Sequence, residues 1–267
     1  MRYIQKILLF IPLMFIISCN SHHLISDDDE LGTVLFTAEL PKDTRAYGNA
    51  SNVDVIYADV FDKNGKKLFR TSSNITSSDI RINISLAKGN KYDVIFWAQN
   101  STSSAYDTSD LSSIKMLDTY AVNNYDDAET MDAFFAVCKD VEVVSTPYSV
   151  ELKRPLAQIN VGTLGPSKPT KICIQGVATT FAPMDKSMSD YQDVTFSYPM
   201  SDQQFMADGN TYNYLAMAYV FAPILNEQVL DVELTFDEGQ TSEKSITLSD
   251  IHIQANKKSN IIGALTQ

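Results

Sequence analysis

IRINISLAKGNKYDVIFWA, residues 80–98, is the stretch that decides the fold class of this chain. Its first seven residues, 80–86, alternate Ile or Leu with polar residues, which predicts a strand with one buried face. Lys88-Gly89-Asn90 predicts a turn, and the aromatic and β-branched residues of 92–98 are typical of a strand inside a sheet. The stretch therefore predicts a mainly-β protein.

The same kind of alternation recurs on both sides of this stretch. It appears at 34–40, where we expect Val34, Phe36 and Leu40 to point inward, and again at 53–57. Asn64-Gly65 soon afterwards is a strong hairpin signal. Strand-like segments separated by turns continue to the C-terminus, and a helical period is almost absent, which favours antiparallel β-sandwiches. Because Gly and Pro residues gather just after residue 160, we expect one sandwich over residues 31–160 and a second over 161–267.

Residues 100–125 form the longest predicted loop, because Ser, Thr, Asp and Asn dominate them. A short helix is a candidate at 110–116, where an Asp or Ser would cap its start. Tyr106, Tyr120 and Tyr125 in this loop are candidates for a flat aromatic platform that binds a ligand. The alternative is that these rings are partly buried and anchor the loop.

The N-terminus has the layout of a secretory signal peptide over residues 1–18, with two basic residues, an apolar run and the small Ser18. The run that ends in Cys19 resembles a bacterial lipobox, in which the Cys is diacylated and becomes the new N-terminus. We expect Cys19 to anchor the chain in a membrane through lipid; a short membrane helix or a plain signal peptide is the alternative. Residues 19–30 then form a lipidated, polar tether, either a plain spacer or a surface-export tag.

The charge balance makes nucleic acid a poor partner for this chain. It carries 21 basic and 33 acidic residues and a formal net charge of −12. A field of this sign repels phosphate backbones, so we expect no binding to nucleic acid.

The residues needed for common catalytic chemistry are largely missing. The chain has three His residues, two of them in the tether and the third, His252, within an expected strand. Phosphate-loop, zinc-helix and hydrolase-elbow motifs are absent, so we expect no enzyme, no cofactor and neither catalytic nor metal-binding residues. A carboxylate-dependent hydrolase is the last alternative, and the acidic stretch 126–132 has oxygen ligands that suit calcium, although a polar loop explains it equally.

Cys138 and Cys173 are the thiols that remain after Cys19. A pair of thiols in an extracytoplasmic protein can form a disulfide. Two small hydrophobic residues in strands explain the pair equally well. Neither Cys has a His close by in the sequence, which argues against a nucleophilic or metal-binding role.

Several segments resemble the fimbrillin-like lipoproteins of Bacteroidales. The matching segments are the lipobox that ends at Cys19, the strand and Thr-Arg pair of 35–46, the strand 91–98, the element 132–135, the junction 153–161 and the closing strand 260–266. The resemblance implies two transthyretin-like β-sandwich domains of Greek-key type. It also implies an outer-membrane location, with the protein anchored by lipid and exposed on the cell surface or in a fimbrium.

In that family, a trypsin-like protease removes the first strand by cutting after an Arg, and a strand from another subunit fills the groove. The bond that matches here joins Arg45 to Ala46; an ordinary exposed Arg in a turn is the alternative. The resemblance therefore implies strand exchange with other pilus subunits as partners. Stalk subunits of the family carry a C-terminal donor segment, and none is evident after 260–266, which favours an anchor or tip subunit or a protein that does not polymerise.

The sequence thus predicts a cell-surface fimbrillin-like lipoprotein, a structural or adhesive pilus component that serves as anchor, tip or stalk. Its partners would be other pilus subunits, the membrane through Cys19, and a host or bacterial surface ligand. The alternative function is that of an outer-membrane surface lipoprotein that binds a glycan or another ligand without polymerising.

Overall fold

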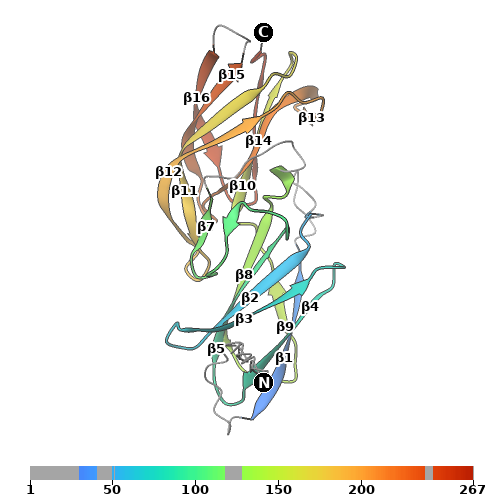
Figure 1. Cartoon of the computed structure of the whole chain (residues 1–267), viewed down its shortest axis with the longest axis vertical. Helices are drawn as coiled ribbons and strands as arrows, with labels where there is room; N and C mark the ends of the chain where they lie inside the picture. The colour runs from blue at the N-terminus through green and yellow to red at the C-terminus, as the bar shows by residue number, and fades with distance from the viewer. Residues whose placement is uncertain (1–29, 41–49, 51, 118–127, 238–242, 267) are drawn as a thin grey trace, which may run out of the picture.

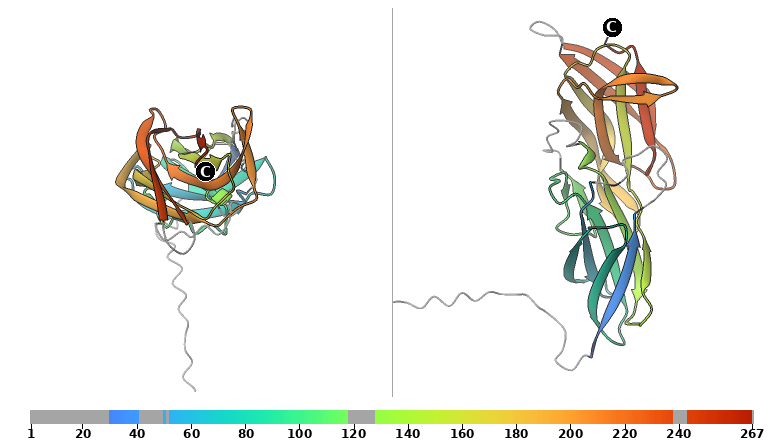
Figure 2. Two further views of the ribbon diagram at one scale, coloured as in Figure 1. Left: turned by 90° about the horizontal axis from the view of Figure 1, so that it is seen from above. Right: turned by 90° about the vertical axis from the view of Figure 1, so that its right-hand side faces the viewer.

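The computed structural model describes residues 30–40, 50, 52–117, 128–237 and 243–266. Apart from two helical residues at 128–129, the regular elements of these described residues are strands, which confirms the predicted mainly-β sandwich fold. Among these described residues, no helix is long and apolar enough to cross a membrane. The molecule is elongated, and its N-terminal and C-terminal halves stack end to end along the long axis (Figures 1 and 2).

The N-terminal half is a sandwich of two sheets. Its strands are β1 (Leu31–Glu39), β2 (Val55–Phe61), β3 (Lys67–Asn74), β4 (Ile80–Ala87), β5 (Tyr92–Gln99), β8 (Ala133–Val141) and β9 (Tyr148–Glu151). One sheet has the order β4-β1-β9, and the other has the order β3-β2-β5-β8. The predicted Asn64-Gly65 hairpin is confirmed as the β2–β3 connection, where Gly65 takes the left-handed φ of 77°.

The pattern of residues 80–98 decides which faces of these sheets are buried. The four apolar side chains of 80–86 all point into the sandwich from β4, with at most 3% of their surface exposed. Strand β5 is buried on both faces: Phe96 packs into the sandwich core, whereas Trp97 packs against the C-terminal half. Two-sided burial explains why 92–98 is apolar almost throughout while 80–86 alternates.

The C-terminal half consists of two layers of strands. They are formed by β10 (Leu156–Thr163), β11 (Thr170–Ala182), β12 (Ser187–Tyr198), β13 (Gln204–Ala207), β14 (Asn210–Phe221), β15 (Gln228–Asp237), β16 (Glu243–Ile253) and β17 (Lys258–Gly263). One layer has the order β12-β11-β15-β16, and the other has the order β13-β14-β10-β17. Pairing of Ala178 with Phe221 joins the two layers into one continuous sheet.

The segment expected to be the longest loop holds a small hairpin of β6 (Tyr106–Asp107) and β7 (Ile114–Met116). The short helix expected over 110–116 is therefore wrong. Ile114 and Met116 are buried on the same side of β7, and the strand pairs with Thr180 and Phe181 of β11. Since that partner lies in the C-terminal half, the loop of one half completes a sheet of the other.

Aromatic side chains from both halves form one shared core. Trp97 of β5 meets Tyr106 of the hairpin at 5.4 Å between ring centroids, and Phe135 of β8 meets Phe181 of β11 at 4.8 Å. Phe221 of β14 contacts both Tyr106 and Phe181. Because close-packed cores resist shear, these contacts fix the two halves relative to each other.

Strand β10 is the first strand of the C-terminal half, and it begins within the stretch where we expected the two sandwiches to meet. Strand β10 begins at Leu156 and pairs along its whole length with β14 and β17, so the expected boundary between residues 160 and 161 lies inside it. Both halves follow one plan, in which the first strand pairs in parallel with the last: β1 with β9, and β10 with β17. These two pairings are exceptions to the antiparallel pattern that we predicted.

Candidate functional site

Strand β1 occupies the middle of the three-stranded sheet. The candidate functional site is the groove between β4 and β9 that β1 fills, which we call the seat of β1. It pairs antiparallel with β4 from Leu31 to Ala38 and in parallel with β9 from Phe36 to Glu39. Each flanking strand therefore depends on β1 for backbone hydrogen bonds along one edge. A chain without β1 would present two unpaired edges separated by the width of one strand.

The side chains of β1 complete the core of the N-terminal half. Val34 and Phe36 have no exposed surface, and Ala38 has 1%. The ring of Phe36 lies edge-on to Phe96 of the opposite sheet at 5.1 Å and stacks on Tyr148 of β9 at 5.5 Å. The predicted inward positions of Val34 and Phe36 are confirmed, and Leu40 is partly buried against the same core.

Contacts at both ends hold β1 in register. At its start, the Lys88 N–H donates to the Glu30 carbonyl at 2.9 Å, and the two side chains form an ion pair. At its end, the Leu152 N–H donates to the Glu39 carbonyl at 3.3 Å. Gly32 is required by a close approach, because a Cβ there would lie 2.3 Å from Cγ1 of Val143.

The packing of β1 in its seat contributes a substantial share of the stability of the N-terminal half. Burying a large apolar side chain stabilises a fold by roughly 1.5–3 kcal/mol, so Val34 and Phe36 together contribute roughly 3–6 kcal/mol. Whole domains are stable by about 5–15 kcal/mol, so losing β1 would remove a large part of that margin. A strand with the same alternation could fill the groove, because backbone pairing and two deep side-chain positions are all that the seat recognises.

Most of the predicted site residues lie outside the described part of the chain. These are the lipidation candidate Cys19, the cleavage candidates Arg45 and Ala46, and the platform candidates Tyr120 and Tyr125. In the sequence, Arg45 comes six residues after Glu39, where β1 ends. A cut after Arg45 would thus separate β1 from every later strand of the fold.

The candidate disulfide between Cys138 and Cys173 is not formed: both are free thiols. Cys138 lies on β8 of the N-terminal half, whereas Cys173 lies on β11 of the C-terminal half, between Thr195 and Glu233 on the neighbouring strands. Burial raises the pKa of Cys138 to about 11, so this thiol stays protonated and unreactive at neutral pH. The alternative of two free thiols in strands is the one that the structure has.

Tyr106 is not part of an exposed platform, which corrects that prediction. Its side chain is buried, its ring packs on Trp97 and Phe221, and its hydroxyl donates to the Met131 carbonyl at 2.6 Å. The ring anchors the long loop, as the alternative reading of this residue held. Tyrosine suits this position because its ring is apolar while its hydroxyl still finds a partner.

Sequence reasoning missed a buried ion pair at the junction of the two halves. Arg154, just before β10, donates from Nε and one terminal nitrogen to the two carboxylate oxygens of Asp132, at 2.6 and 2.7 Å. Its other terminal nitrogen donates to Oδ1 of Asn256 at 3.0 Å, and its guanidinium lies 4.8 Å from the Phe134 ring centroid. The one signal in the sequence was a pair of charged residues inside apolar stretches, 131–135 and 154–157.

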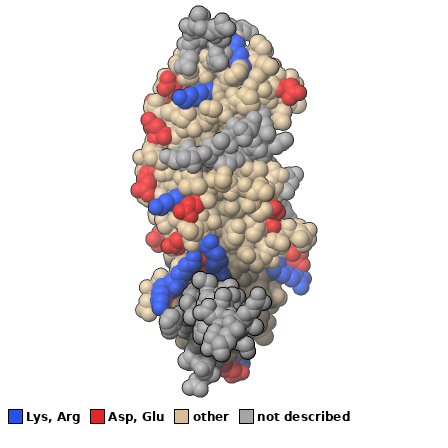
Figure 3. Space-filling model, in the orientation of Figure 1, with Lys and Arg blue, Asp and Glu red and all other residues tan. Residues whose placement is uncertain are grey.

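In the acidic stretch considered for calcium, the described acidic residues Glu129 and Asp132 have other roles. Glu129 accepts a hydrogen bond from the Tyr219 hydroxyl at 3.1 Å, and burial raises the pKa of this carboxyl. Asp132 belongs to the ion pair with Arg154, while residues 126 and 127 are outside the described part. No group of three or more His, Cys, Asp or Glu residues is placed to hold a metal within the described residues. On the face shown in Figure 3, Asp and Glu side chains are scattered over both halves.

Solved structures share this mainly-β sandwich fold. A candidate polysaccharide-binding protein (DUF1812) from Bacteroides thetaiotaomicron is similar with a TM-score of 0.55 and 15% identity, over 82% of this chain and 80% of that one. A candidate adhesin from Bacteroides ovatus gives 0.51 and 16%, over 83% and 78%. Another candidate adhesin, from Bacteroides thetaiotaomicron, gives 0.52 and 12%, over 82% and 81%. At these identities the likeness defines a fold class that candidate adhesins of Bacteroides share.

The chain belongs to a family of unknown function, DUF6562, which it matches over residues 28–267. The match covers both halves of the molecule, including β1 and the Arg154 junction. No curated protein matches this chain. Family and fold are therefore established, and the function has to be argued from the site.

Proposed function

We propose that this protein is a cell-surface, fimbrillin-like lipoprotein that serves as a structural or adhesive component of a pilus and acts by β-strand exchange. Candidate adhesins among the structures with the same fold support the broader role in adhesion. Lipid on Cys19 would hold the uncut chain at the outer membrane, and other pilus subunits would be its partners once the cut after Arg45 has released β1. The proposal assigns the protein neither catalytic activity nor a cofactor.

The seat of β1 is the single observation that carries the proposal. An N-terminal strand fills the centre of a sheet, buries Phe36 completely and is joined to the rest of the fold through residues 40–54. In that arrangement one cut after Arg45 frees a groove without breaking any other strand. A donor strand from a second subunit would restore both the ladder and the core, which makes assembly favourable.

Strand replacement in the purified protein tests this function. Limited trypsin digestion should cut the full chain after Arg45, and a labelled synthetic peptide of residues 31–40 should then bind the cut protein. A matched peptide with Ser in place of Val34 and Phe36 should fail to bind, because it lacks both deep side chains. The uncut Arg45→Gln protein should bind neither peptide; equal binding of both peptides to the cut protein would refute strand exchange.

A second candidate function, binding of a glycan or another ligand without polymerisation, is favoured by a different surface. A cavity of about 270 Å³ lies between the β11–β12 turn and the β14–β15 connection. Two of its lining side chains are exposed, Tyr191 at 58% and Leu225 at 84%, beside the polar Asp185 and Asn226. An exposed ring with polar neighbours suits a sugar face, and one protein of the same fold is a candidate polysaccharide binder. Glycan-array binding that is lost in Tyr191→Ala would support this function, and equal binding would exclude this surface.

A further inference from the structure

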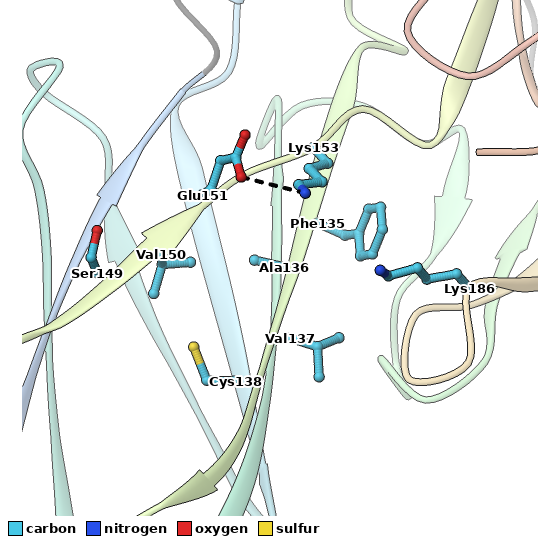
Figure 4. Close-up of a pocket in the computed structure, with 9 residues that line it drawn as sticks. All are labelled: Phe135, Ala136, Val137, Cys138, Ser149, Val150, Glu151, Lys153 and Lys186. Atoms are coloured by element: carbon cyan, nitrogen blue, oxygen red, sulfur yellow. Dashed lines mark ion pairs between the residues drawn. The ribbon is translucent and has the colours of Figure 1, made fainter. Parts of the chain in front are cut away.

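A slot opens between the two sheets of the N-terminal half, on the side away from β4. It has a volume of about 220 Å³ and is lined by residues 135–138 of β8, residues 149–151 of β9, and Lys153 and Lys186 (Figure 4). We call it the β8–β9 slot. It lies outside the seat of β1, and the proposed function does not use it.

The slot exists because two sheet edges meet at one point and then diverge. Strand β8 is the last strand of one sheet, and β9 is the last strand of the other. They are bridged where Phe135 and Lys153 exchange two backbone hydrogen bonds, of 2.8 and 2.9 Å. Beyond this bridge no pairing joins β8 to β9 in the described chain, so each strand keeps a free edge along the slot.

The direction of the backbone groups follows from these pairings. Phe135 directs its N–H and C=O away from β5 toward Lys153, so Val137, two residues further along β8, directs its own toward the slot. On the other wall, the Leu152 N–H donates to the Glu39 carbonyl of β1. Ser149 and Glu151, which alternate with Leu152, therefore direct their backbone groups into the slot. Unpaired edge groups of this kind are what an added strand binds.

Charge indicates which extended segment suits the slot. Lys153 forms an ion pair with Glu151 at 3.4 Å, so these two charges largely cancel. Lys186, in the β11–β12 turn, has no ion-pair partner within the described residues, and its side chain extends toward Phe135 and β8 (Figure 4). One uncompensated ammonium group at the slot favours a carboxylate on the incoming segment.

We propose that the β8–β9 slot binds an extended, acidic peptide segment of a partner protein by strand addition. The segment pairs with the free backbone edges at Val137 and Ser149, and one of its carboxylates lies beside Lys186. Strand addition here requires neither cleavage after Arg45 nor the release of β1. It would thus give the intact protein a second contact surface, separate from the β1 seat.

Peptide display on the uncut full chain tests the proposal. A phage library of random decapeptides should yield binders that alternate β-branched residues and carry net negative charge. Lys186→Glu should weaken their binding about fivefold and lower its salt dependence, since it removes the attraction. Lys171→Glu, an equal charge change at an exposed position of β11, should leave binding unchanged. An absence of binders, or binders that respond equally to both changes, would overturn the proposal.

A second measurement tests the backbone pairing itself. Val137→Pro removes the N–H of β8 that points into the slot and should abolish binding. Because this N–H points away from β5, the proline leaves the hydrogen bonds between β5 and β8 in place. Should that variant fold poorly, the selected peptide can be changed instead of the protein. Two versions of the peptide would be made, one N-methylated at its odd-numbered residues and the other at its even-numbered residues. At least one of them should bind tenfold more weakly than the unmethylated peptide. Full binding by both versions would show that the peptide does not add as a strand. Because β1 stays in place throughout, this result is independent of the strand-replacement assay.

Discussion

Replacing Phe36 with alanine should destabilise the N-terminal half by about 3–5 kcal/mol, the usual cost of emptying a buried phenylalanine site. The ring has no exposed surface and contacts the rings of Phe96 and Tyr148 at 5.1 and 5.5 Å. Phe96 and Tyr148 belong to different sheets, so the core cannot readily collapse into the cavity. The value expected is therefore in the upper part of this range.

Urea unfolding followed by tryptophan fluorescence measures the effect, since Trp97 lies on β5 and is fully buried. With a slope of about 1–3 kcal/mol per molar urea, the midpoint should fall by about 1–5 M at an unchanged slope. Leu31→Ala is the matched control on the same strand. Leu31 is 48% exposed, so its truncation should change stability by no more than about 0.5 kcal/mol.

A loss of less than about 1 kcal/mol for Phe36→Ala would refute the reasoning. It would mean that β1 adds little to the core and that its seat could stand empty at small cost. The groove would then have no strong need for a replacement strand, and the physical basis of exchange would be gone.

Three further predictions concern packing and charge. Arg154→Ala should cost about 3–5 kcal/mol in thermal or urea unfolding, because it leaves the Asp132 carboxylate buried without its cation. Gly32→Ala should destabilise β1 through its 2.3 Å clash with Val143, and the additional change Val143→Ala should restore most of the loss in a double-mutant cycle. Burial raises the pKa of Asp59, but hydrogen bonds from two cationic side chains outweigh it and hold the pKa below its ordinary value. Its contribution is thus present above about pH 4 and lost below it, and Asp59→Asn should flatten that acid limb in unfolding measured against pH.

Local patterns predicted the strands of the N-terminal half well. Alternation over 80–86 predicted a one-sided strand, and the dense apolar run of 92–98 predicted a buried one, because side-chain period and burial are coupled within a single strand. The Asn64-Gly65 pair was by itself enough to predict the hairpin between β2 and β3. The inward positions of Val34 and Phe36 likewise followed from alternation.

What the sequence could not predict depends on partners far along the chain. The segment 110–116 is short, and its last three residues become strand β7 because β11 lies beside them. Tyr106 sits in a polar stretch but is buried, since the residues that cover it include Phe221 of β14. The ion pair of Asp132 with Arg154 spans the junction of the halves, and no local pattern marks two such residues as neighbours.

The mature N-terminus of the protein, taken from the native cell envelope and read by intact mass and terminal peptide mapping, tests strand exchange most directly. The account predicts an N-terminus at Ala46, with β1 lost and a foreign strand in its seat. An acylated Cys19 at the N-terminus with the Arg45–Ala46 bond intact would contradict it. The protein would then remain anchored with its own β1 in place, and its contacts would have to be made through other surfaces.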